Sequence, residues 1–289
     1  MKIESNNDKS RRWNKPYSRA WYALIAIVTF VVIDHLSDLL HQLNLRRFMH
    51  WQVVLAIRNA LEVVCSILGV AVAHRGGLKR AVRELGMTAP VMPGVTFAAI
   101  ASAPMLITFA IGFSINREMT FLSVGVGCFI APFAEEVIFR GYLFRQLYQR
   151  AKMGFWVSAL IPSILFAAGH AYQATHLMEL TGILAITSFG SVLLCWLYKR
   201  WNYNLWVIVA IHSAMNLWWE VFAVDNTALG GWLANGARFA TIACAIFLTI
   251  FKDRFWSSAP VADDATNDGE RISIETKKDS SVRLIPSVA

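Results

Sequence analysis

Charged residues are scarce in this sequence. Only 16% of its 289 residues are Asp, Glu, Lys or Arg, and 56% are hydrophobic, whereas a soluble domain carries about a quarter charged residues. This shortage argues against a soluble fold. The apolar residues also fall in runs of about twenty, which is the length that a helix needs to cross the hydrocarbon core of a bilayer. The composition therefore predicts an all-α integral membrane protein.

Cysteine is equally sparse, and several functional signatures are missing. The four cysteines lie singly in apolar stretches without a C-x-x-C pair, so neither a disulfide framework nor a cysteine metal site is indicated. The sequence also lacks a repeat of fixed period and a Gly-rich phosphate loop. Acidic residues number 19 against 27 basic ones, but the basic residues lie in short connections beside apolar runs and indicate membrane topology. We expect no nucleic-acid partner and no cofactor.

The apolar runs predict about eight transmembrane helices, and the polar residues lie between them. The basic connections alternate along the chain, with Arg46 and Arg47 as an exception, so the positive-inside rule predicts cytoplasmic N- and C-termini. The first run lacks a clear small-residue cleavage site, and we expect it to remain as a transmembrane helix. The predicted location is a multi-pass membrane position, in the plasma (inner) membrane if the host is bacterial. The predicted helices are 20–41, 52–74, 92–114, 121–144, 154–173, 179–198, 203–222 and 232–251.

The chain is predicted to consist of five parts. A basic cytoplasmic segment is predicted at 1–19, the first three helices at 20–114, and the last helix at 232–251. Between them, residues 121–222 contain the polar motifs described below and form the predicted catalytic core. Residues 257–289 are rich in Ser, Asp, Asn and Lys, which predicts a disordered cytoplasmic tail.

The densest polar group at membrane depth contains Glu135, Glu136 and Arg140. An ionisable side chain at that depth costs at least about 2.5 kcal/mol on insertion scales, so each one requires a partner, a wet cavity or a function. Glu136 and Arg140 are four residues apart and can pair, whereas Glu135 points about 100° away from Glu136. Glu135 is therefore left without a local counter-ion. A carboxylate in such a poorly solvated site suits a general base or acid.

Two further helices carry polar pairs with the spacing of one helical turn. Phe166 and His170 end the fifth predicted helix, and His212 and Asn216 lie in the seventh. Each pair shares one helix face. Together with Glu135, these helices supply a base, two imidazoles and a carboxamide that can donate to a tetrahedral oxyanion. We therefore predict an intramembrane polar site built from these residues.

The remaining membrane-depth charges are interpreted as structural. Arg58 and Glu62 are four residues apart and can form an ion pair. Others lie near predicted helix ends, where long side chains can reach water; these are Glu179, Glu220 and Arg238. The sequence assigns no defined role to Asp34, His35, Asp38, Arg58 or Glu62.

Three motifs, taken in order, resemble the CAAX protease and bacteriocin-processing family of intramembrane endopeptidases, which is related to the CAAX prenyl proteases. Residues 135–140 resemble the family's E-E-x-x-x-R, residues 166–170 its F-x-x-x-H, and residues 212–216 its H-x-x-x-N. The resemblance covers about residues 121–222. Each motif is weak alone, but their combination in this order is specific.

The resemblance implies a glutamate-type endopeptidase that hydrolyses a peptide bond of a membrane-associated or lipidated substrate. Glu135, helped by His170, would activate water, and His212 with Asn216 would hold the oxyanion. Glu136, Arg140 and Phe166 would support the site or bind substrate. The likeness leaves the substrate open, because a prenylated C-terminus, a bacteriocin-like leader and another anchored peptide all fit.

Two alternatives stay open. Glu135, His170 and His212 could bind zinc, although the H-E-x-x-H helix of common zinc proteases is absent. A membrane transporter or a non-catalytic scaffold could use the same polar residues. The predicted helix boundaries also place Glu135 and His170 towards opposite membrane faces, so depth alone does not bring these two together.

Overall fold

The computed structural model describes residues 17–256, apart from the side chains of Ser37 and His41. The tail predicted at 257–289 and most of the segment predicted at 1–19 lie outside these residues. Within residues 17–256 the chain forms helices and no strand. The helices described below belong to one compact unit, Met1–Lys252, and α13 (Lys252–Phe255) begins at its boundary.

Six helices of the described chain are long and apolar enough to cross a membrane, and a bent pair brings the number to seven. The prediction of an all-α, multi-pass membrane protein is therefore confirmed. The seventh predicted segment, 203–222, is a shorter apolar helix of 17 residues, α11 (Leu205–Val221), and is not among these six. The six are α2 (Arg19–Gln42, continued by the 3-10 turn η1, Leu45–Arg47), α3 (Trp51–His74), Phe121–Arg150, α9 (Phe155–Ala168, continued by η5, Ala171–Gln173), α10 (Leu177–Arg200) and α12 (Trp232–Ile250).

The bent pair consists of α5 (Met92–Ala101) and α6 (Ala103–Gly112), which meet at an angle of 43°. Pro104 stands in the first turn of α6. A proline inside a helix lacks the backbone N–H and clashes with the carbonyl four residues earlier, so it bends the helix there. That carbonyl belongs to Ile100, and it accepts a weak bond from the thiol of Cys244 in α12 at 3.9 Å. The single predicted helix 92–114 is thus two half-helices.

The helix from Phe121 to Arg150 is the most unusual element. Short α-helical turns, α7 (Phe121–Val124) and α8 (Ala131–Glu135), alternate with π-helical segments η2 (Gly125–Ile130), η3 (Glu136–Phe144) and η4 (Gln146–Arg150). π-helix is rare and is frequent at functional sites. The prediction that this helix ends at residue 144 is wrong: Arg145 and Arg150 lie in the helix, because both guanidinium groups bind Glu84 of α4 (Leu78–Glu84).

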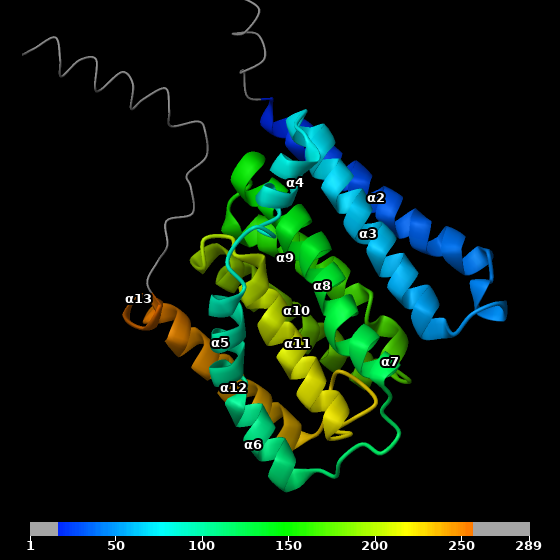
Figure 1. Cartoon of the computed structure of the whole chain (residues 1–289), viewed down its shortest axis with the longest axis vertical. Helices are drawn as coiled ribbons and strands as arrows, with labels where there is room; N and C mark the ends of the chain where they lie inside the picture. The colour runs from blue at the N-terminus through cyan, green and yellow to red at the C-terminus, as the bar shows by residue number, and fades with distance from the viewer. Residues whose placement is uncertain (1–16, 257–289) are drawn as a thin grey trace, which may run out of the picture. The chain divides into compact units, whose positions relative to one another are not determined.

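Figure 1 shows how the helices pair. The α2 and α3 helices lie side by side, α5 packs against α11, α6 against α12, and α9 against α10. The α5–α11 contact is close because a Cβ atom at Gly94 would lie 2.4 Å from the carbonyl oxygen of Trp206. The α11 helix also contacts η2, α8 and η3, so it lies at the centre of the region that carries the polar motifs.

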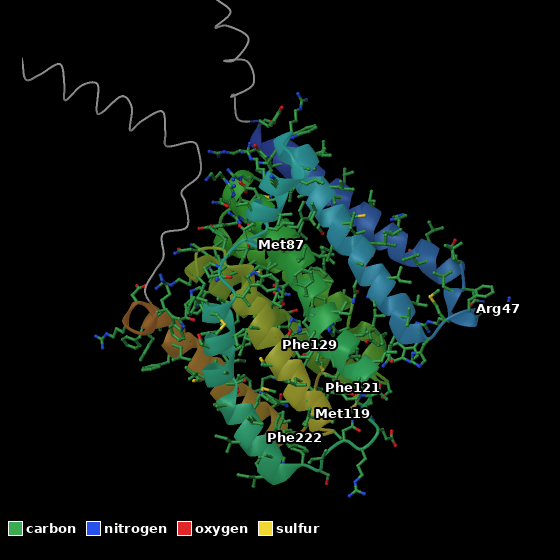
Figure 2. All side chains as sticks on the ribbon, viewed as in Figure 1. Arg47, Met87, Met119, Phe121, Phe129 and Phe222 are labelled. Carbon is green, nitrogen blue, oxygen red and sulfur yellow. The ribbon has the colours of Figure 1, made fainter. Side chains whose placement is uncertain are left out.

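Large apolar side chains point outwards over much of this unit. On α2, for example, Leu24, Ile27 and Val28 are about half exposed. Phe121 and Phe129, labelled in Figure 2, are likewise exposed on the Phe121–Arg150 helix. An aqueous surface does not favour so many exposed apolar side chains, whereas lipid does. The packing thus agrees with a multi-pass integral membrane protein.

Candidate functional site

Glu136 and Arg140 form the buried base of the candidate site. Both side chains are fully buried in η3, and Arg140 Nη1 donates to Glu136 Oε1 at 2.9 Å. The predicted pairing is confirmed. The Arg140 guanidinium also lies 4.6 Å from the ring centroid of Phe166, a distance at which a cation is attracted to the face of an aromatic ring. The pair and the ring together fix η3 against α9.

His212 lies beside both glutamates of the first motif. Its Nδ1 atom is 2.7 Å from Oε1 of Glu136, and its Nε2 atom is 3.7 Å from Oε2 of Glu135. A carboxylate oxygen only accepts hydrogen bonds, so Nδ1 carries a proton. The Nε2 atom therefore faces the Glu135 carboxylate, at a distance that a small group such as water can bridge.

His170 is held by its own helix. Its Nδ1 atom lies 2.9 Å from the carbonyl oxygen of Phe166, which can only accept, so Nδ1 is the donor. Its Nε2 atom is then free to accept. The Phe166 ring lies 4.6 Å from the His170 ring and 6.3 Å from the His212 ring, so Phe166 separates and positions the two imidazoles.

Asn216 lies one turn beyond His212 on α11, as its spacing predicts. Its Nδ2 group donates to the carbonyl oxygen of Gly127 at 3.4 Å. That bond uses one of the two N–H groups of the amide. The carboxamide is thereby held by η2 and retains a second N–H group for another acceptor.

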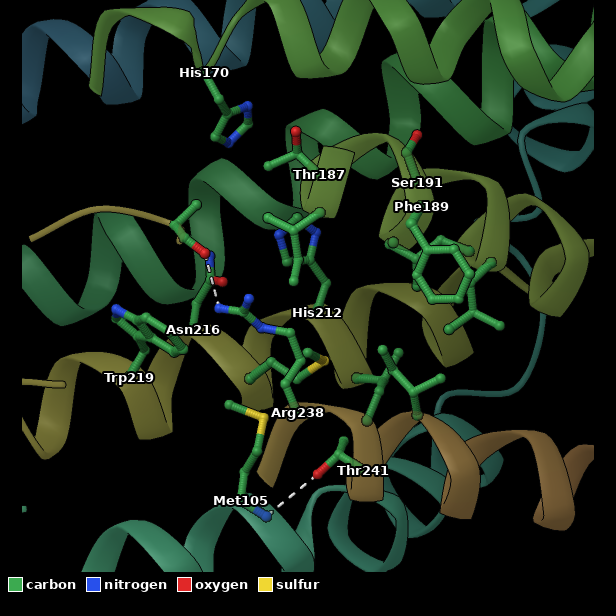
Figure 3. A pocket seen from close by; sticks show the side chains of 18 of the residues that line it. Met105, His170, Thr187, Phe189, Ser191, His212, Asn216, Trp219, Arg238 and Thr241 are labelled. Carbon is green, nitrogen blue, oxygen red and sulfur yellow. Dashed lines mark hydrogen bonds between the residues drawn. The ribbon is translucent and has the colours of Figure 1, made fainter. Parts of the chain in front are cut away.

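One cavity of about 410 Å³ joins three of the four residues predicted to be catalytic: His170, His212 and Asn216 line it. Figure 3 shows His212 in the middle of the view, with His170 above it and Asn216 and Trp219 to the left. Glu135 is not among its lining residues. Its side chain is 29% exposed and lies 3.7 Å from His212, which does line the cavity.

The helix boundaries explain how Glu135 and His212 meet. The fourth helix runs on to Arg150 and contains 30 residues, so Glu135 lies halfway along it rather than towards its cytoplasmic end. His212 likewise lies in the middle of α11. His170 remains at the end of its helix, beyond α9, and lines the same cavity as His212. Within residues 17–256 it makes no hydrogen bond or ion pair with Glu135.

Sequence reasoning misplaced Arg238. It was expected to reach water from a helix end, but it is only 8% exposed and lines the cavity. Its Nη1 group donates to Asn235 Oδ1 at 2.8 Å and its Nη2 group to the carbonyl oxygen of Ala228 at 2.9 Å. The connection before α12 folds over Arg238, and no feature of the sequence indicates this fold. Thr187, Ser191 and Cys128 were also missed as lining residues.

Arg58 and Glu62 behave as predicted. Arg58 Nε lies 3.3 Å from Glu62 Oε1 in α3, and neither residue lines the cavity. Among residues 17–256, no three His, Cys, Asp or Glu side chains are grouped closely enough to hold a metal ion. The three side chains of the zinc alternative are therefore not assembled as ligands in this conformation.

The fold defines a multi-pass membrane protein, and a buried polar cluster lies among its helices. Residues 117–218 match the family described as type II CAAX prenyl endopeptidase Rce1-like. The resemblance to the CAAX protease and bacteriocin-processing family is therefore confirmed over the region that carries the three motifs.

A curated relative points the same way. Over 95 residues the chain is 33% identical to the protein named Putative membrane peptidase YdiL of Bacillus subtilis (strain 168). The match covers 33% of this chain and 34% of that protein, so the chain spans about a third of the length of the relative. No solved structure matches.

Proposed function

We propose that this protein is an intramembrane endopeptidase, a hydrolase that cleaves a peptide bond of a membrane-associated protein or peptide. The proposal rests chiefly on the position of His212 between two glutamates. His212 bonds to Glu136 directly, and a water molecule could bridge it to Glu135. The matches to a CAAX prenyl endopeptidase family and to a membrane peptidase support it. The cavity beside these groups is large enough for several residues of a peptide.

In the proposed reaction Glu135 is the general base. Its carboxylate takes a proton from water while the water oxygen attacks the scissile carbonyl carbon. His170 Nε2, which is free to accept, orients the water. The tetrahedral intermediate then collapses, the C–N bond breaks, and the proton held by Glu135 passes to the departing amine. The products are a carboxylic acid and an amine.

His212 and Asn216 are proposed to hold the oxyanion. Asn216 has a second N–H group that can donate to the oxyanion. His212 can donate from Nε2 when its imidazole carries both protons, while its Nδ1 group continues to donate to Glu136. The charges then balance, because the glutamates Glu135 and Glu136 offset Arg140 and the imidazolium. When Glu135 takes the proton, its negative charge moves to the oxyanion. Fixed donors aimed at that charge accelerate such reactions by about 10²–10³-fold per donor.

The test is Glu135→Gln, which keeps the size of the side chain and removes the base. We expect cleavage to fall by at least about 10²-fold, with folding unchanged, when membrane proteomes or anchored peptides are analysed by mass spectrometry for cut products. Glu118→Gln is the matched control, because Glu118 is exposed in the connection after α6. Full cleavage by the Glu135→Gln protein would refute the assignment.

A second experiment distinguishes the glutamate mechanism from the zinc alternative. Purified protein is treated with a chelator, its zinc content is measured, and cleavage is assayed before and after zinc is restored. The glutamate proposal requires activity in the stripped protein. If one bound zinc ion per protein restores the lost activity, Glu135, His170 and His212 would instead be assigned as zinc ligands.

A further inference from the structure

Arg238 is a buried cation that lines the cavity and forms no ion pair with any residue from 17 to 256. Among the described residues no carboxylate oxygen lies within 4.0 Å of its guanidinium. Its two recorded hydrogen bonds go to neutral acceptors, Asn235 Oδ1 and the Ala228 carbonyl oxygen. A buried charge is costly unless it is paired. The charge of Asp225 acts on Arg238 only from beyond 4.0 Å, so an arginine within this apolar helix is expected to have a function.

The guanidinium is held in one orientation. It stacks 4.5 Å from the ring centroid of Trp219, and the Trp219 Nε1 group donates to the Asp225 carbonyl oxygen at 3.1 Å. Figure 3 shows Arg238 reaching from α12 to the side of the cavity where Asn216 and Trp219 are labelled. An arginine fixed in this way is suited to bidentate binding of a planar anion.

Two acidic residues line the same cavity, Glu220 and Asp225. One oxygen of the Asp225 carboxylate is occupied, since it accepts from the backbone N–H and the hydroxyl of Thr227 at 2.8 and 3.1 Å. Neither carboxylate lies within 4.0 Å of the Arg238 guanidinium, although the charge of Asp225 attracts it from a greater distance. Both acids repel anions. Because this repulsion grows with the charge of the ligand, it opposes a doubly charged phosphate more than a singly charged carboxylate.

The position of Arg238 relates it to the proposed reaction centre. Trp219, on which it stacks, follows His212 by seven residues of α11, which corresponds to about 10 Å along the helix. An extended peptide covers about 3.3 Å per residue. A peptide whose scissile carbonyl lies at His212 can therefore place a group near Arg238 within a few residues.

We propose that Arg238 binds a carboxylate of the peptide substrate and sets which bond reaches His212. This inference rests on the proposed function, because it takes the cavity to be the peptide-binding site. The binding itself does not require cleavage. The carboxylate is either the C-terminus of the peptide or an acidic side chain. Both present the same planar anion to the guanidinium, and the experiment below distinguishes them.

The test measures binding to the full-length Glu135→Gln protein in lipid nanodiscs. The probes are fluorescent, N-palmitoylated hexapeptides of neutral residues that end in a free carboxylate, in a carboxamide, or in a carboxamide with one Asp at a varied position. We expect a carboxylate to bind about tenfold more tightly than the carboxamide, as for a charge-assisted bond. A preference for the free acid assigns the C-terminus, and a preference for the Asp peptide assigns the side chain.

In the same background, Arg238→Gln is expected to abolish the difference in affinity between the carboxylate and carboxamide peptides. Arg238→Lys is expected to keep part of that difference. Arg58→Gln is the matched control, since Arg58 lies at membrane depth but outside the cavity. The comparison of acid with amide needs no change at Arg238, so it remains valid if Arg238→Gln fails to fold.

Equal affinity for acid and amide, including binding of neither, would overturn the proposal. So would retention of the preference by Arg238→Gln, or displacement of the peptide by inorganic phosphate but not by acetate. Failure of the protease assignment gives a different result: no cleavage by the protein with Glu135 intact, with the carboxylate preference still present.

Discussion

Glu136 and His212 are joined by a hydrogen bond of 2.7 Å although they lie 76 residues apart in the chain. The same Glu136 oxygen accepts from Arg140, so one buried atom connects η3 with α11. His212 is consequently fixed with Nε2 towards Glu135. Glu136 is thus a positioning residue, and its removal should affect both stability and the proposed chemistry.

Glu136→Gln is expected to destabilise the protein by about 3–5 kcal/mol, because it leaves the Arg140 charge buried without a counter-ion. Thermal unfolding in detergent, followed by tryptophan fluorescence, measures the loss. The double variant Glu136→Gln/Arg140→Met removes both charges and should unfold at a higher temperature than the single variant. A single variant as stable as the unchanged protein would contradict the view that this ion pair is buried and required.

The Glu84–Arg150 ion pair at the other end of the long helix predicts a dependence of stability on pH. Arg150 Nη2 lies 2.5 Å from Glu84 Oε1. Burial alone would raise the pKa of Glu84, but the hydrogen bond and charge of Arg150, with the charge of Arg145, lower the pKa overall. A carboxyl group with a lowered folded-state pKa stabilises the fold above its unfolded pKa, and this contribution is lost as the pH falls through the lowered value.

Unfolding temperatures should therefore fall as the pH decreases from about 4.3, the ordinary pKa of glutamate, into more acidic solution. Glu84→Gln should lower stability near neutral pH and make the curve flatter in that acidic range. The control is Glu118→Gln, whose exposed side chain should leave the curve unchanged. An identical slope for the Glu84→Gln and unchanged proteins would assign the pH dependence to other groups.

The parts of the site that follow helical spacing could be read from the sequence. Residues four apart on one helix lie together whatever the tertiary fold, so the Glu136–Arg140 and Arg58–Glu62 pairs were predictable. The bond from Glu136 to His212 was not, because it depends on how η3 packs against α11. The polar residues on three helices, and then the family resemblance, predicted that these helices meet, but neither predicted this particular bond.

Three features were not predicted correctly, each for a different physical reason. The length of the fourth helix was underestimated because basic residues such as Arg145 and Arg150 are typical of a solvated connection, whereas Glu84 of a neighbouring helix binds both. The π-helical segments had no sequence signal, since a change from i→i−4 to i→i−5 bonding needs no special residue. Arg238 was misread because its burial depends on the preceding connection rather than on α12 itself.

Gly94 allows α5 and α11 to approach closely. An added Cβ atom there would lie 2.4 Å from the Trp206 carbonyl oxygen, a backbone atom that cannot move aside freely. Gly94→Ala should therefore destabilise the protein by about 1–3 kcal/mol, as overpacking does. Gly236→Ala in α12 is the control, because nothing lies within 4 Å of its added Cβ atom. Equal unfolding temperatures for the two variants would show that α5 can shift without cost.

The orientation of the termini depends on whether α11 crosses the membrane. The backbone N–H of Leu205 and the indole of Trp206, at its start, donate to Gly86 and Met87 in the connection before α5. The carbonyl oxygen of Val221, at its end, accepts from Asn116 after α6. Because α11 thus meets both ends of the α5–α6 pair, and its 17 residues cover about 25 Å, we predict that it spans wherever that pair spans.

With α11 counted, we predict eight crossings and cytoplasmic N- and C-termini, in agreement with the basic connections. Alkaline phosphatase fused after Leu229 in a Gram-negative bacterial host should then be active, because the connection before α12 would be periplasmic. Fusions after Arg83 and after Phe255 should be inactive, and a fluorescent protein fused after Phe255 should fluoresce. An inactive Leu229 fusion with an active Phe255 fusion would show that α11 does not cross, and would place the C-terminus on the opposite side from the N-terminus.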